Sequence, residues 1–215
     1  MQTDNEQFDQ FKTFLKENGI AITVGIVIGV GGLVGWNFYE KHQVKTVQNE
    51  AAEYYTTITA LNKSKELIVE EGTENPEKQK TYEQIRAYLK TDESNYVGIV
   101  ALAFAKELAA EKSFKEAEAV LSDVSRKNID KNLASSINYM LANLQSEQKK
   151  FDDAIATLNT IPTNEWGANR FELKADILKR KGDIQEARKL YEQAITVADP
   201  SIQEYLRVKL NNLPS

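Results

Sequence analysis

The sequence contains no cysteine, a single histidine and only four prolines among its 215 residues. Without cysteine, the chain can form no disulfide bond, thiolate zinc site, iron–sulfur cluster or cysteine nucleophile. The one histidine, His42, leaves almost no room for a histidine-based metal site, and no serine or acidic partner is marked to orient it for catalysis. We therefore predict that the protein is not an enzyme. No catalytic, metal-binding or cofactor-binding residue is expected, and no cofactor.

An excess of positive charge is also missing. The chain has 27 basic and 32 acidic side chains, a formal net charge of −5 and a pI near 5.2. Nucleic-acid-binding proteins usually concentrate basic residues on one face, so nucleic acid is not an expected partner. Acidic pairs such as Asp152–Asp153 fall at expected helix ends, where carboxylates favour the helix dipole, and we do not interpret them as a site.

One long uncharged run stands out from this polar composition. Residues 18–39 contain no charged side chain, and a membrane-spanning helix needs about 20 apolar residues. Trp36 and Tyr39 lie where an interfacial aromatic belt would be. A cleaved signal peptide is disfavoured, because the charged residues before the run are mostly acidic and no small-residue cleavage site follows it. We predict a single transmembrane helix over residues 18–39.

The predicted span carries small residues on one side. Gly25, Gly29, Gly32 and Trp36 are spaced by four, three and four positions and so share one helical face. Such faces let helix backbones approach closely in lipid, which predicts a face that docks on another membrane helix. The alternative is that glycine is simply common in transmembrane helices. Lysines near the two ends of the span are balanced two against two, so charge does not decide its orientation.

The remainder of the chain is predicted to be helical. Apolar residues recur at intervals of three and four, and no sustained period-two alternation indicates a strand. We expect an all-α protein with four parts. They are a short cytoplasmic tail (1–17), the transmembrane helix (18–39), N-terminal helices that form a linker, a divergent repeat or a cap (40–95), and helical repeats with a C-terminal capping helix (96–215).

The repeats are visible when three segments are aligned on Ala117, Ala154 and Ala187, at offsets of 37 and 33 residues. Each alanine follows an aromatic or aliphatic residue by three positions, and another apolar helix lies upstream of each segment. A helix pair that repeats at about 34 residues is typical of tetratricopeptide repeats. Gln145 departs from the pattern, because the second repeat has no bulky apolar residue there. Stacked repeats form a concave surface that usually binds protein segments.

Local motifs along the chain resemble those of a known protein family. The span ends in Gly35-Trp36 and is followed by His42-Gln43-Val44, Asn95-Tyr96 enters the first clear repeat, Trp166-Gly167 precedes the third, and Lys209 to Leu213 reads Lys-Leu-Asn-Asn-Leu. In these features the chain resembles the YfgM family from end to end. The resemblance implies a bacterial inner-membrane protein with a cytoplasmic N-terminus and periplasmic repeats. It also implies association with the SecYEG translocon and with PpiD, a membrane-anchored periplasmic chaperone, and it brings no catalytic residues.

Two functions are then open. In the first, the chain is a membrane-anchored scaffold that links emerging, unfolded secretory proteins to a PpiD-like chaperone, with Trp166 and Tyr96 as candidate residues of a protein-binding groove. In the second, the tail of residues 1–17 binds a regulator of an envelope stress response. Deleting the tail while keeping the anchor separates the two.

Overall fold

The computed structural model of the chain describes residues 12, 16, 32, 36, 39–40, 42–67 and 75–214, with the backbone alone for 163–165. The chain divides into two units, Met1–Asn49 and Glu50–Ser215. Among the described residues, no helix combines the length and the apolar character needed to cross a membrane. Most of the predicted span, including Gly25 and Gly29, lies outside the described residues, as does most of the tail. The transmembrane helix therefore stays a prediction.

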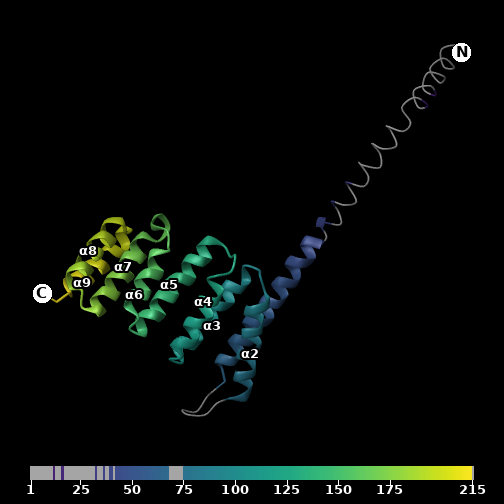
Figure 1. The fold of residues 1–215 in the computed structure, drawn as a ribbon, viewed down its shortest axis with the longest axis horizontal. Helices are drawn as coiled ribbons and strands as arrows, with labels where there is room; N and C mark the ends of the chain where they lie inside the picture. The colour runs from purple at the N-terminus through teal and green to yellow at the C-terminus, as the bar shows by residue number, and fades with distance from the viewer. Residues whose placement is uncertain are drawn as a thin grey trace. The chain divides into compact units, whose positions relative to one another are not determined.

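All regular structure in the described residues is helical, which confirms the all-α class. In the second unit, residues 50–65 are helical and eight labelled helices follow (Figure 1): α2 (Pro76–Thr91), α3 (Tyr96–Ala110), α4 (Phe114–Val124), α5 (Lys131–Glu147), α6 (Phe151–Asn159), α7 (Thr163–Lys181), α8 (Ile184–Val197) and α9 (Pro200–Asn211).

Three helix pairs match the three aligned sequence repeats. They are α3 with α4, α5 with α6, and α7 with α8. Ala117, Ala154 and Ala187 each lie in the second helix of their pair and are completely buried. A small side chain at these positions lets the two helices of a pair approach closely, since packing distance depends on the side chains at the contact. The single helix α9 follows the last pair and buries Leu206, and its role as a capping helix stays a prediction.

The turn inside each pair has the same backbone geometry. Lys112, Lys149 and Gly182 occupy equivalent places and have φ angles of 60°, 61° and 98°. In each turn the following residue donates its N–H to a carbonyl five residues earlier, at 2.8 Å for Ser113 and 2.9 Å for Asp183. This is the Schellman arrangement that ends a helix with one left-handed residue. Only the third turn uses glycine, the residue that adopts this conformation without strain.

Residues 50–65 and α2 form a further pair of helices ahead of the repeats. The side chain of Asn75 accepts hydrogen bonds from the N–H groups of Glu77 and Lys78, which caps α2 at its first turn. Tyr82, Ile85 and Leu89 are buried, and they share one core cluster with Leu61 and the first helix pair. This part of the chain is therefore continuous with the core of the repeats.

The exception at Gln145 has a structural explanation. Its side chain is only 8% exposed, and its Oε1 accepts a hydrogen bond from the hydroxyl of Thr157 on α6 at 2.8 Å. A polar contact between α5 and α6 thus takes the place of the apolar contact expected there. A buried amide is tolerated when its polar atoms are bonded in this way.

Polar contacts also join successive repeats. Arg180 binds Glu147 at 2.7 Å, Lys150 binds Glu118 at 2.7 Å, and the two partners lie 33 and 32 residues apart in the sequence. Gly98 lets α3 approach α5, because a Cβ placed there would lie 2.5 Å from Cδ2 of Leu133. The stack is therefore held by apolar packing with charged contacts at the repeat spacing. Pairs this exposed contribute at most about 1 kcal/mol each.

Candidate protein-binding surface

The predicted membrane docking face is described at two of its four positions. Gly32 and Trp36 are both helical; a Cβ at Gly32 would meet nothing within 4 Å, and Trp36 is 69% exposed with its ring 6.4 Å from that of Tyr39. Among the described residues of the first unit, no other helix packs over Gly32 or Trp36. Their role as a docking face stays a prediction.

A group of aromatic and aliphatic side chains, two of them exposed and two half-buried, lies at the junction of residues 50–65 with α3. We call Tyr54, Tyr55, Tyr96 and Ile99 the N-terminal patch. The rings of Tyr54 and Tyr96 are stacked with centroids 5.0 Å apart, and Tyr55 meets Tyr54 edge-on at 5.2 Å. Tyr55 is 67% exposed and Ile99 is 41% exposed. Aromatic residues are enriched at protein interfaces, so this patch is a candidate contact surface.

The side of α3 that faces away from this patch is buried in the core. Val97, Val100 and Ala101 alternate with Tyr96 and Ile99 along α3 and are completely buried. The core side of α3 is therefore fixed while Ile99 points outward. Nearby Tyr88 belongs to the core instead, where burial and the charge of Asp92 raise the pKa of its hydroxyl to about 12. In this half of the molecule Tyr88 is therefore buried, Tyr54 and Tyr96 are half-buried and Tyr55 is exposed.

Trp166 occupies a different environment. It lies near the start of α7 with backbone angles of φ −120° and ψ 18°, which interrupt the helix, and its ring is 5.3 Å from that of Tyr139 on α5. The side chain is half-buried and packs against the core cluster that contains Leu158 and Ile177. Tyr96 and Trp166 are candidate residues of one groove; the structure packs Trp166 against Tyr139 and stacks Tyr96 on Tyr54. Whether either binds protein stays a prediction.

The C-terminal repeat carries a set of interacting polar and aromatic side chains that sequence reasoning missed. We call Tyr139, Trp166, Glu172, Asp176, Tyr191, Tyr205 and Lys209 the C-terminal cluster. Lys209 Nζ on α9 donates to Glu172 Oε1 at 2.8 Å and also to Asp176, whose other oxygen accepts from the Tyr191 hydroxyl. The same ammonium group lies 5.4 Å from the ring centre of Tyr205. Only the 33-residue spacing of Lys209 and Asp176, close to the repeat length, hints at this contact in the sequence.

Charge and burial shift several pKa values in this cluster. Burial disfavours the charge on Lys209, but its bonds to Asp176 and Glu172 outweigh that effect and raise the pKa of its ammonium group. Burial and the bond to Asp176 raise the pKa of Tyr191. Burial and the two carboxylates of Glu172 and Asp176 raise the pKa of Tyr139. These groups satisfy one another, so the arrangement ties α9 to α7 and α8 and offers no activated acid, base or nucleophile.

Within the described residues, no group of three or more His, Asp or Glu side chains is arranged to hold a metal ion. The chemistry that these surfaces do offer is non-covalent. Exposed rings provide apolar area with polar edges, and helix faces provide shape.

Comparison with known proteins connects this architecture to one family. A family model described as a tetratricopeptide repeat-like domain matches residues 12–215. The chain is 30% identical over 213 residues to the ancillary SecYEG translocon subunit of Escherichia coli strain K12, covering 99% of this chain and 97% of that protein. The chain belongs to the YfgM family.

Further family members extend the similarity. The ancillary SecYEG translocon subunit of Haemophilus influenzae strain Rd is 29% identical over 210 residues, and that of Neisseria gonorrhoeae is 25% identical over 217 residues. Both matches cover 98% of this chain and 97% of the relative. No solved structure matches the chain at a significant level. The family match agrees with the helical repeats seen here, and the membership that the sequence motifs indicated is confirmed.

Proposed function

We propose that the protein is a non-enzymatic, membrane-anchored scaffold associated with the SecYEG translocon. The observation that carries this proposal is the near full-length similarity to relatives named ancillary SecYEG translocon subunits, including the region of the predicted span. The fold supports it, because tetratricopeptide-like repeats usually present a surface for other protein chains rather than a reaction centre.

The proposed topology is that of a single-pass protein in the bacterial inner membrane. Residues 1–17 lie in the cytoplasm, residues 18–39 cross the membrane, and the repeats lie in the periplasm. In this arrangement Gly25, Gly29, Gly32 and Trp36 dock on a translocon helix. The small residues permit close backbone contact, which is the main source of helix association in lipid.

The repeats are proposed to link emerging, unfolded secretory proteins to a PpiD-like periplasmic chaperone. The N-terminal patch is the principal contact surface, because Tyr55 and Ile99 are exposed and Tyr96 is braced by Tyr54. Trp166 is a second proposed contact, through the part of its side chain that is not covered by Tyr139. Anchoring the repeats beside the translocon raises the effective concentration of these partners, so that individually weak contacts suffice.

The test is photo-crosslinking in cells that produce the full-length chain together with the SecYEG translocon. One probe replaces Gly32 in the predicted span and another replaces Ile99 in the N-terminal patch. The proposal predicts adducts of the first probe with a translocon subunit and of the second with a membrane chaperone or an emerging chain. Adducts of both probes with a second copy alone, or no adducts, would overturn it.

A further inference from the structure

A groove separate from the N-terminal patch runs between α2 and α4. It encloses about 190 Å³ and is lined on its apolar side by Leu89, Ala119, Val120 and Val124. Leu89 and Val124 are almost completely buried and form the floor, while Ala119 is exposed at the opening. An apolar cavity of about 150 Å³ is enough to bind a benzene ring, so this groove accommodates one large aliphatic or aromatic side chain.

The opening persists because of two features of the surrounding residues. Ala119 is too small to cover the floor. At one end Arg86 lines the groove, where its guanidinium group is bonded to Glu116 on α4 and lies 5.7 Å from the ring of Phe104. Arg86 is therefore held at the rim of the groove by Glu116 rather than folded over the apolar floor.

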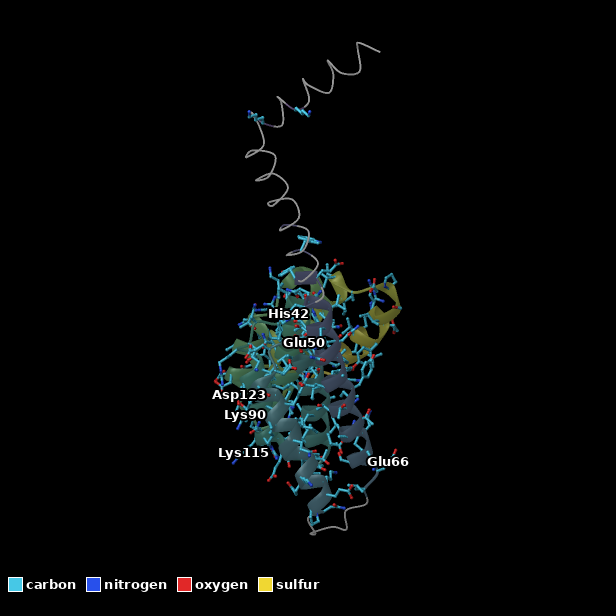
Figure 2. The ribbon with its side chains drawn as sticks, turned by 90° about the vertical axis from the view of Figure 1, so that its right-hand side faces the viewer. His42, Glu50, Glu66, Lys90, Lys115 and Asp123 are labelled. Atoms are coloured by element: carbon cyan, nitrogen blue, oxygen red, sulfur yellow. The ribbon has the colours of Figure 1, made fainter. Side chains whose placement is uncertain are left out.

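The charged side chains at the groove differ in whether they have an ion-pair partner. Glu116 is paired with Arg86, and Asp123 is paired with Arg126. Lys90 also lines the groove, and in the part of the chain that the structure describes it has no carboxylate within ion-pair distance. Figure 2 shows Lys90, Asp123 and Lys115 along the same side of the molecule. Among the described lining residues, the charge without an ion-pair partner is that of Lys90, which is positive although the whole chain carries a net charge of −5.

We propose that this groove binds an acidic amphipathic segment of a partner protein, which inserts one large apolar side chain between α2 and α4 and places a carboxylate against Lys90. Large side chains that fill pockets on the partner carry most of the binding energy at interfaces. The partner is recognised through second helices, whereas the scaffold function proposed above uses the N-terminal patch on α3. The two surfaces can thus be occupied at the same time.

The chain provides a simple probe of this groove, because it has no cysteine of its own. A single cysteine at Ala119, labelled with an environment-sensitive fluorophore, reports on the groove in the full-length protein in detergent. Ala156 is the matched control, since it occupies the same place in the next repeat, two residues after the aligned alanine, and is likewise exposed. Both labelled proteins are titrated with a synthetic helical peptide bearing leucines on one face and glutamates beside them. A second peptide with lysines in place of the glutamates completes the pair.

The expected result is saturable binding of the acidic peptide at Ala119→Cys and not at Ala156→Cys, with no binding of the basic peptide. Lys90→Glu should weaken binding at least about tenfold and Lys90→Arg should preserve it, because only the first reverses the charge. Added salt should also weaken binding, since the ion pair is exposed. Equal binding of both peptides, an equal response at Ala156→Cys, or no response to the acidic peptide would overturn the proposal. Failure here leaves the translocon crosslinks from Gly32 unaffected, so the two proposals are tested separately.

Discussion

The N-terminal patch and the C-terminal cluster are built from similar aromatic side chains but differ in how those side chains are satisfied. In the C-terminal cluster, Lys209 joins two carboxylates and the Tyr191 hydroxyl binds Asp176, so most of the polar atoms have partners within the chain. In the N-terminal patch, the Tyr55 ring has one aromatic neighbour and is otherwise exposed. The comparison indicates that the C-terminal cluster stabilises the end of the repeat stack, while the N-terminal patch is available to a partner.

The largest expected effect comes from removing the exposed apolar surface of the N-terminal patch. Tyr55→Ser combined with Ile99→Ser should reduce co-isolation of a PpiD-like chaperone at least about tenfold, since each good interface anchor contributes more than about 1 kcal/mol. The free energy of unfolding should change by less than about 0.5 kcal/mol, because both side chains are exposed. Quantitative co-isolation from membranes and urea unfolding measure the two quantities.

The matched control lies in the other region. Tyr205 and Val208 are also an exposed aromatic and aliphatic pair, 56% and 49% exposed on α9. Tyr205→Ser combined with Val208→Ser should leave chaperone co-isolation unchanged. If both double variants lose the chaperone equally, the distinction between the two regions is wrong.

The next effect tests whether Trp166 mainly packs against Tyr139. Trp166→Ala should lower the free energy of unfolding by about 2 kcal/mol, which is less than for a fully buried tryptophan because the side chain is half-buried. Trp166→Phe should recover most of that loss, because a ring at this position still meets Tyr139. Urea unfolding of the two variants provides the measurement. A Trp166→Ala protein of unchanged stability would contradict the packing role and favour direct contact with a partner.

A smaller loss is expected when the central cation of the C-terminal cluster is removed. Lys209→Met leaves Glu172 and Asp176 without their common partner and should cost about 1–2 kcal/mol, the lower part of the range for buried pairs because these groups are partly exposed. Lys106→Met on α3 is the control, since Lys106 is exposed and makes no ion pair with the described residues. Hydrogen exchange should show faster exchange in α9 for the first variant alone. Equal protection of the α9 amide hydrogens in both variants would contradict the role of Lys209 in holding α9 against α7.

The smallest effect concerns alkaline pH. Burial raises the pKa of Tyr88 to about 12, above the ordinary value near 10, so the folded state disfavours the ionised tyrosine. The unfolded state then releases its proton first, and stability is lost as the pH rises from about 10 toward 12. This residue alone should account for about 1 kcal/mol at pH 11. Urea unfolding at pH 8 and pH 11 measures the loss, and a Tyr88→Phe protein with the same loss would contradict the assignment.

Much of the fold is predictable because it depends on local periodicity. The spacing of Ala117, Ala154 and Ala187 predicts the three helix pairs, and the Lys-Gly-Asp turn at 181–183 predicts the third bend. The polar contact of Gln145 with Thr157 is not predictable from spacing. Whether a glutamine at a core position finds a hydrogen-bond partner depends on how the two helices pack.

The candidate surfaces were harder to predict for the same reason. Tyr54 and Tyr96 are 42 positions apart, and their stacking depends on how residues 50–65 pack beside α3. A tyrosine whose ring is exposed and one whose ring is buried follow the same helical spacing, so Tyr55 and Tyr88 differ only in the folded chain. The apolar groove between α2 and α4 likewise results from one small residue, Ala119, on a helix whose pattern is ordinary.

The most direct test of the account is crosslinking from the N-terminal patch in cells that contain the translocon. A photo-reactive residue at Ile99 is compared with one at Asn169, which is also exposed but lies on α7. The account predicts that Ile99 forms adducts with a membrane chaperone or an emerging secretory chain, and that Asn169 forms few. Equal yields from both positions, or no adducts from Ile99, would contradict the central claim that this patch is the partner-binding surface of a translocon-associated scaffold.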